Sequence, residues 1–136
     1  MSFALREHTA DVAVEATGDT LGATFAAVAD GLAAAHVDGI PEGGERFELS
    51  VAAESREALL FDYLDELIYQ RDVREVLPVD NEVDVAGEGD DWRLDGSARG
   101  VPLPGLGARE VKAVTYSQMA LEETDAGWRA YVVFDV

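Results

Sequence analysis

The sequence has no cysteine among its 136 residues. Disulfides, thiolate-bound metals and cysteine nucleophiles are therefore excluded. It also has no apolar run near the ~20 residues that a membrane-spanning helix needs. Its first eight residues lack the basic and apolar regions of a signal peptide. At roughly 100–200 residues per domain, the length predicts one domain over residues 1–136, and we expect it in the cytoplasm.

Basic residues are scarce. Ten Lys and Arg stand against 28 Asp and Glu, which gives a formal net charge of −18. Independent nucleic-acid binding is not expected, because it needs a basic surface. Hydrophobic residues make up 48% of the chain, which is enough for a core and argues against disorder. At ~1 M salt the Debye length is about 3 Å, so repulsion between exposed carboxylates is screened. The composition therefore predicts a halophilic protein.

Two segments have apolar residues at helical spacing. The first follows Asp19 or Thr20, either of which can cap it. Its apolar face comprises Leu21, Phe25, Val28, Ala29 and Leu32. The second follows Ser55, and its apolar face comprises Leu59, Leu60, Tyr63, Leu64, Leu67 and Ile68. Acidic residues occupy much of the rest of this second helix, as expected for a solvated surface.

Seven segments are typical of strands. They cover residues 3–8, 12–16, 46–51, 73–86, 92–101, 111–121 and 128–136, and Gly and Pro place loops at 38–44, 87–91 and 102–107. Helices and strands do not alternate regularly, and the strands near the ends form hairpin-like pairs. We therefore predict an α+β fold with a mainly antiparallel sheet and two helices.

Two acidic residues interrupt apolar segments. Asp11 precedes Val12-Ala-Val14, and Asp135 lies in the apolar segment that ends at Val136. Asp11 can serve a turn, and Asp135 can lie at a sheet edge in water. If the two segments meet, Asp11, Asp135 and the α-carboxylate of Val136 would converge and favour a cation. Such oxygen ligands suit Ca²⁺, Mg²⁺ or Mn²⁺ better than zinc.

Other site chemistry has little support. The two histidines, His8 and His36, lack metal-ligand spacing, and no Gly-rich segment has the context of a phosphate loop. Lys112 is the only lysine of the chain. A compact ammonium is not interchangeable with a guanidinium, so Lys112 is either a functional contact or an ordinary surface lysine.

An ordered set of landmarks resembles the archease family. It comprises His8-Thr-Ala-Asp11, Thr20-Leu21, Phe25, Leu59-Leu60, Tyr63-Leu64, Glu66-Leu-Ile-Tyr69, Glu110-Val-Lys-Ala-Val-Thr-Tyr116, Gly127-Trp128 and Phe134-Asp-Val136. These landmarks extend over nearly the whole chain. One position departs from the pattern, because many archaeal relatives have His where this chain has Ser117, and we give that position no role.

The resemblance implies a small α+β protein that assists an RtcB-type RNA ligase in tRNA splicing. It implies faster formation of the ligase–guanylate intermediate and multiple turnover, with no nucleophile supplied by the archease itself. The family's metal site corresponds to Asp11, Asp135 and Val136, with Ca²⁺ as the first candidate and Mg²⁺ or Mn²⁺ as alternatives. Lys112 matches a family lysine and is the candidate contact with the ligase.

Two other classes of function stay open. One is a general chaperone or methyltransferase partner, an older interpretation of this family. The other is a stand-alone metal-dependent hydrolase, which would need a general base and a substrate clamp that the sequence does not indicate.

Overall fold

The structure, a computed structural model, describes residues 2–8, 11–106 and 111–136. In chain order the elements are β1 (Ser2–His8), β2 (Asp11–Gly18), α1 (Leu21–His36), β3 (Glu45–Ala53), α2 (Arg56–Arg74), β4 (Val76–Glu88), β5 (Asp91–Pro102), β6 (Ala113–Thr124) and β7 (Gly127–Asp135). The strands form two antiparallel sheets, in the orders β1-β2-β7-β6 and β3-β5-β4. The first and last parts of the chain thus share one sheet.

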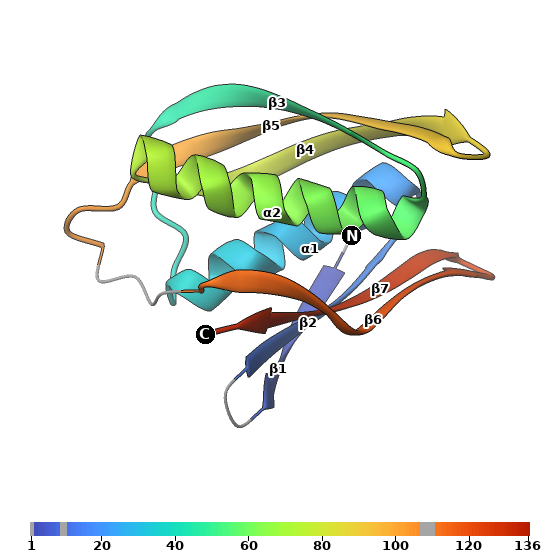
Figure 1. Cartoon of the computed structure of the whole chain (residues 1–136). Coiled ribbons are helices and arrows are strands. Elements are labelled where there is room, and N and C mark those ends of the chain that lie inside the picture. The colour runs from blue at the N-terminus through green and yellow to red at the C-terminus, as the bar shows by residue number, and fades with distance from the viewer. Residues whose placement is uncertain (1, 9–10, 107–110) are drawn as a thin grey trace.

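Both helices lie between the two sheets (Figure 1), and each contacts strands of both. The α+β class with two helices is confirmed, but the strands form two sheets where we expected one. The reason lies in α1, which is apolar almost all round and needs cover on both sides. Its glycines allow the close approach. A Cβ on Gly22 would collide with the Val83 carbonyl of β4, and one on Gly31 with Val14 of β2.

The two helix starts follow the predicted capping chemistry. Thr20 caps α1, and its Oγ1 accepts a hydrogen bond from Ala23 N at 3.0 Å. Ser55 caps α2 in the same way, with 3.1 Å between its Oγ and Ala58 N. The predicted apolar face of α2 is buried at every position, and Arg71 is buried with it. Each cap satisfies a backbone N–H that the first turn leaves without a partner.

The predicted boundary between α2 and β4 is wrong. We expected a strand from Val73, but α2 continues to Arg74 and β4 begins only at Val76. The last turn is stabilised by side chains, since Arg74 Nε donates to Gln70 Oε1 at 2.6 Å and its guanidinium lies over Phe47. Glu75 then ends the helix in the left-handed conformation, with φ of 54°.

Candidate functional site

The start of β2 and the end of β7 lie side by side. In their antiparallel register Asp11 is the direct partner of Asp135. Val12 and Phe134, the next pair, pack into the core between the sheets. Side chains alternate between the two faces of a strand, so Asp11 and Asp135 both point to the face away from the helices. Directly opposed residues have Cβ atoms about 4.5–5.5 Å apart, so the fold brings the two carboxyl groups together.

Among the residues whose side chains the structure describes (3–4, 11–106 and 111–136), these two carboxylates have no cationic partner. Neither Asp11 nor Asp135 forms an ion pair or a side-chain hydrogen bond with any of those residues. Glu15, further along the same strand, has Arg129 as its partner, with 2.9 Å between Glu15 Oε2 and Arg129 Nε. Opposed like charges are destabilising, and a cation held between the two carboxylates would relieve that repulsion.

Lys112 and Val136 lie at the same sheet end. The Lys112 N–H donates to the carbonyl oxygen of Asp135 at 2.8 Å, and the Lys112 side chain is exposed. Val136 follows Asp135 directly and is 46% exposed. The fold therefore gathers all four residues that the sequence nominated.

The donor set at this sheet end suits a hard divalent ion. Its side chains offer only carboxylate oxygens, which Ca²⁺ and Mg²⁺ prefer. No three His, Asp or Glu side chains are arranged to hold a metal in the part of the chain that the structure describes. Asp11 and Asp135 would therefore need further oxygens, from Val136 or from water. Thr9 and Ala10 of the His8–Asp11 segment and Glu110 of the Glu110–Tyr116 segment lie outside the described residues.

A second facing acidic pair lies on the other sheet. Asp84 of β4 is the register partner of Asp95 of β5, and both line an open groove on that sheet. Here Asp95 Oδ1 accepts from Ser50 Oγ at 2.8 Å, and Glu82, which lines the same groove, pairs with Arg46 at 3.6 Å. This pair serves as an internal comparison for the pair at the end of β2 and β7.

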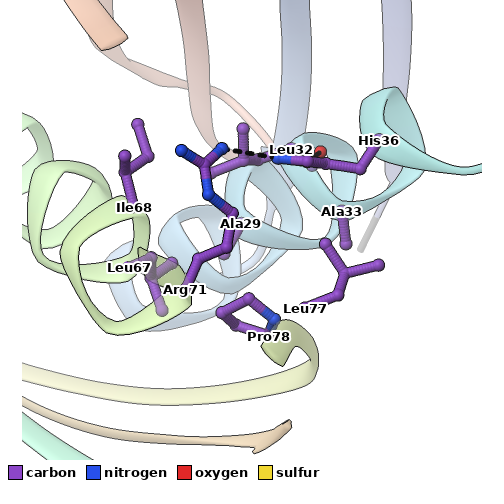
Figure 2. Close-up of a pocket in the computed structure, with 9 residues that line it drawn as sticks. All are labelled: Ala29, Leu32, Ala33, His36, Leu67, Ile68, Arg71, Leu77 and Pro78. Carbon is purple, nitrogen blue, oxygen red and sulfur yellow. Dashed lines mark hydrogen bonds between the residues drawn. The ribbon is translucent and has the colours of Figure 1, made fainter. Parts of the chain in front are cut away.

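The sequence analysis missed a buried polar group beside the site. Arg71 extends from α2 toward His36 of α1, next to a small cavity lined mainly by apolar side chains (Figure 2). Arg71 Nη1 lies 2.9 Å from His36 Nε2 and also donates to the carbonyl oxygen of Val111. One signal was present in the sequence, because Arg71 continues the spacing of the apolar face of α2.

The fold and this sheet end define a class: a small α+β protein with two helices between antiparallel sheets and a facing aspartate pair where the first and last strands meet. The sequence profile of the archease protein family (MTH1598/TM1083) matches residues 3–136. The chain therefore belongs to the archease family.

Individual relatives agree with this assignment. Protein archease of Pyrococcus furiosus is 35% identical, with 96% of this chain and 95% of that protein covered. Protein archease of Archaeoglobus fulgidus is 35% identical with both chains fully covered.

Two solved structures share the fold. The solution structure of Methanobacterium thermoautotrophicum protein 1598 matches with a TM-score of 0.85 and 29% identity, covering 98% of each chain. A Thermotoga maritima crystal structure, described as an archease and possible chaperone, matches with a TM-score of 0.64 and 23% identity, covering 96% of this chain and 94% of its own. The second supports the fold alone. Across the described residues, no helix of this protein is long and apolar enough to cross a membrane.

Proposed function

We propose that this protein activates an RtcB-type tRNA-splicing RNA ligase. Membership of the archease family supports an accessory role. The observation that carries the proposal is the direct pairing of Asp11 with Asp135 in the sheet. In this role the protein promotes ligase guanylylation and multiple turnover and is not itself an enzyme. Partnership with a tRNA ligase would place its action in the cytoplasm.

In this proposal Asp11, Asp135 and Val136 hold one divalent ion, with Ca²⁺ preferred over Mg²⁺ or Mn²⁺. Such an ion supplies positive charge that can organise and neutralise nucleotide phosphates. The protein's own contribution is position. Strands β2 and β7 place half-buried Asp11 and exposed Asp135 at one sheet end, where a partner can approach them.

Lys112 is the proposed contact with the ligase. Its backbone is bonded to Asp135, while its side chain is exposed. A mobile ammonium beside a carboxylate-held cation suits an anionic group of the partner or its nucleotide. The metal site and the contact would then act on the same region of the ligase.

The test is a ligation assay with purified ligase, GTP and cleaved RNA. We expect multiple turnover only when the protein is added, and loss of stimulation in Asp11→Ala, Asp135→Ala and Lys112→Ala. Asp84→Ala, in the comparison pair on the other sheet, should stimulate as the parent does. Full stimulation by both Asp11→Ala and Asp135→Ala would refute the metal proposal.

The same preparations separate the alternative functions. A general chaperone, the role that the description of the Thermotoga maritima structure names for that protein, should suppress aggregation of unrelated proteins, and Asp135→Ala should retain that ability. A stand-alone metal-dependent hydrolase should cleave its substrate without any ligase. Under our proposal, the protein alone has neither activity.

A further inference from the structure

One peptide group beside the proposed site is held from both sides. The carbonyl oxygen of Val111 accepts from buried Arg71, and the N–H of Lys112 donates to the Asp135 carbonyl at 2.8 Å. These two atoms belong to the same planar peptide unit, in which C=O and N–H point in opposite directions. A single rigid group therefore links helix α2 to the end of β7.

Arg71 is itself fixed in place. Its Nη1 lies 2.9 Å from His36 Nε2, and its Nε donates to Asp72 Oδ1 at 2.9 Å (Figure 2 shows the contact with His36). A guanidinium can only donate, so His36 Nε2 accepts and the ring is neutral. His36 Nδ1 then carries the proton and donates to the Leu32 carbonyl, 2.9 Å away. Both helices thus orient the guanidinium.

We propose that Arg71 is a positioning residue for the functional site. Through the peptide between Val111 and Lys112, it holds the backbone of Asp135 in register with Asp11. It also fixes the backbone position from which the Lys112 side chain extends. Hydrogen bonds from a charged donor are stronger than neutral ones. A carbonyl polarised in this way also strengthens the bond that the N–H of the same peptide donates.

Water is a poor substitute for this guanidinium. The adjacent cavity has a volume of about 10 Å³ and is lined chiefly by apolar side chains, among them Leu32, Leu67 and Leu77. Such a volume is close to the minimum for one water molecule. Removal of the guanidinium would leave the Val111 carbonyl buried without a strong donor, at a cost comparable with a lost charged hydrogen bond.

The chain offers a selective probe, because Lys112 is its only lysine. Labelling with ¹⁵N-lysine gives one backbone amide signal, at the peptide in question. In the parent protein this amide should exchange slowly with solvent, although it precedes the first residue of β6. In Arg71→Met it should exchange at least about tenfold faster at matched global stability.

The matched control is Arg74→Met, one turn further along α2 with an exposed side chain. It should leave Lys112 exchange unchanged. Equal protection in Arg71→Met and the parent, or rapid exchange in the parent, would overturn the proposal. If Arg71→Met does not fold, Arg71→Gln is assessed by the same criteria.

A second NMR signal tests the hydrogen bond to the Val111 carbonyl in the parent protein alone. The sequence contains one Val-Lys pair, so ¹³C-valine with ¹⁵N-lysine selects the Val111 carbonyl. We expect a low-field carbonyl shift typical of a strong hydrogen bond, and a shift typical of a free carbonyl would overturn the role of Arg71.

The expected effect of Arg71 on metal affinity rests on the proposed function and is measured separately. Ca²⁺ titrated into the same ¹⁵N-lysine samples should shift the Lys112 signal at lower concentration in the parent than in Arg71→Met, while Arg74→Met follows the parent. Absence of any Ca²⁺ response in the parent would refute the metal site and leave the exchange result standing. A Ca²⁺ response of equal affinity in the parent and Arg71→Met would refute the positioning role.

Discussion

Asp30 of α1 holds the bulged part of β4. One of its oxygens, Oδ1, accepts from both the backbone N and the side-chain Nδ2 of Asn81, at 3.1 and 2.9 Å. Burial raises the pKa of the Asp30 carboxyl above its ordinary value of 3.8, although the two hydrogen bonds from Asn81 oppose the shift. The folded state therefore binds a proton at Asp30 more readily than the unfolded chain does.

The sign of the resulting pH effect follows from linkage. A raised folded-state pKa contributes stability that is fully present below 3.8 and is lost as the pH rises through the folded pKa. Asp30→Asn removes this contribution and keeps an oxygen for Asn81. We expect the unfolding free energy of the parent, relative to Asp30→Asn, to increase as the pH is lowered from 7 toward 4. Denaturant titrations at several pH values measure this, and a relative stability independent of pH would contradict it.

Between elements, one aromatic contact joins α2 to the bulge of β6. Phe61 and Tyr116 stack with ring centroids 4.0 Å apart and planes at 5°, although Tyr116 is 54% exposed. The register of β6 shifts between Thr115 and Ala120, and Gln118 within that interval has φ of 59°. The bulge thus places Tyr116 on the helix.

A double-mutant cycle tests this contact. We expect Phe61→Ala and Tyr116→Ala to couple by about 0.5–1.5 kcal/mol, as stacked aromatic pairs do. Tyr69→Ala, on the exposed face of the same helix, serves as the control and should change stability by no more than about 0.5 kcal/mol. Additive effects of the two substitutions in chemical denaturation would contradict the stack.

The elements show how far the sequence could be interpreted. Capping residues and the apolar face of α2 were predictable, because both depend on local spacing. The division into two sheets was not, since it follows from the packing of α1 on both sides. The bulges in β4 and β6 depend on tertiary partners such as Asn81 and Phe61. For the same reason the end of α2 was misplaced, as Arg74 is held by Gln70 and Phe47.

For the candidate site, the sequence could identify Asp11 and Asp135 as candidates, but it could not show that they are partners in the sheet. Asp11 and Asp135 were candidates because each interrupts an apolar segment, and the family resemblance joined them. Their register joins two residues 124 positions apart in the sequence (135 − 11), which no local pattern encodes. The role of Arg71 was hidden because an arginine at a buried helical position gives no hint of its acceptor.

Across the whole molecule, the net charge of −18 predicts a dependence on salt. Repulsion among so many carboxylates opposes the compact state, and salt screens it. We expect the melting temperature to rise between 0.1 and 3 M KCl. A variant with Glu48→Gln, Asp84→Asn and Asp95→Asn in the groove of the three-stranded sheet should show a smaller rise. Equal melting temperatures at both salt concentrations would contradict the halophilic interpretation.

The central claim is that strands from opposite ends of the chain place Asp11 and Asp135 together to bind one divalent cation. Calorimetric titration of Ca²⁺ at constant KCl tests it most directly, with the parent, Asp11→Asn, Asp135→Asn and, as the matched control, Asp84→Asn. We expect one site in the parent and in Asp84→Asn, and binding at least about tenfold weaker, or about 1.4 kcal/mol, in each of the other two variants. Equal affinity in all four proteins, or no binding in the parent, would contradict the account.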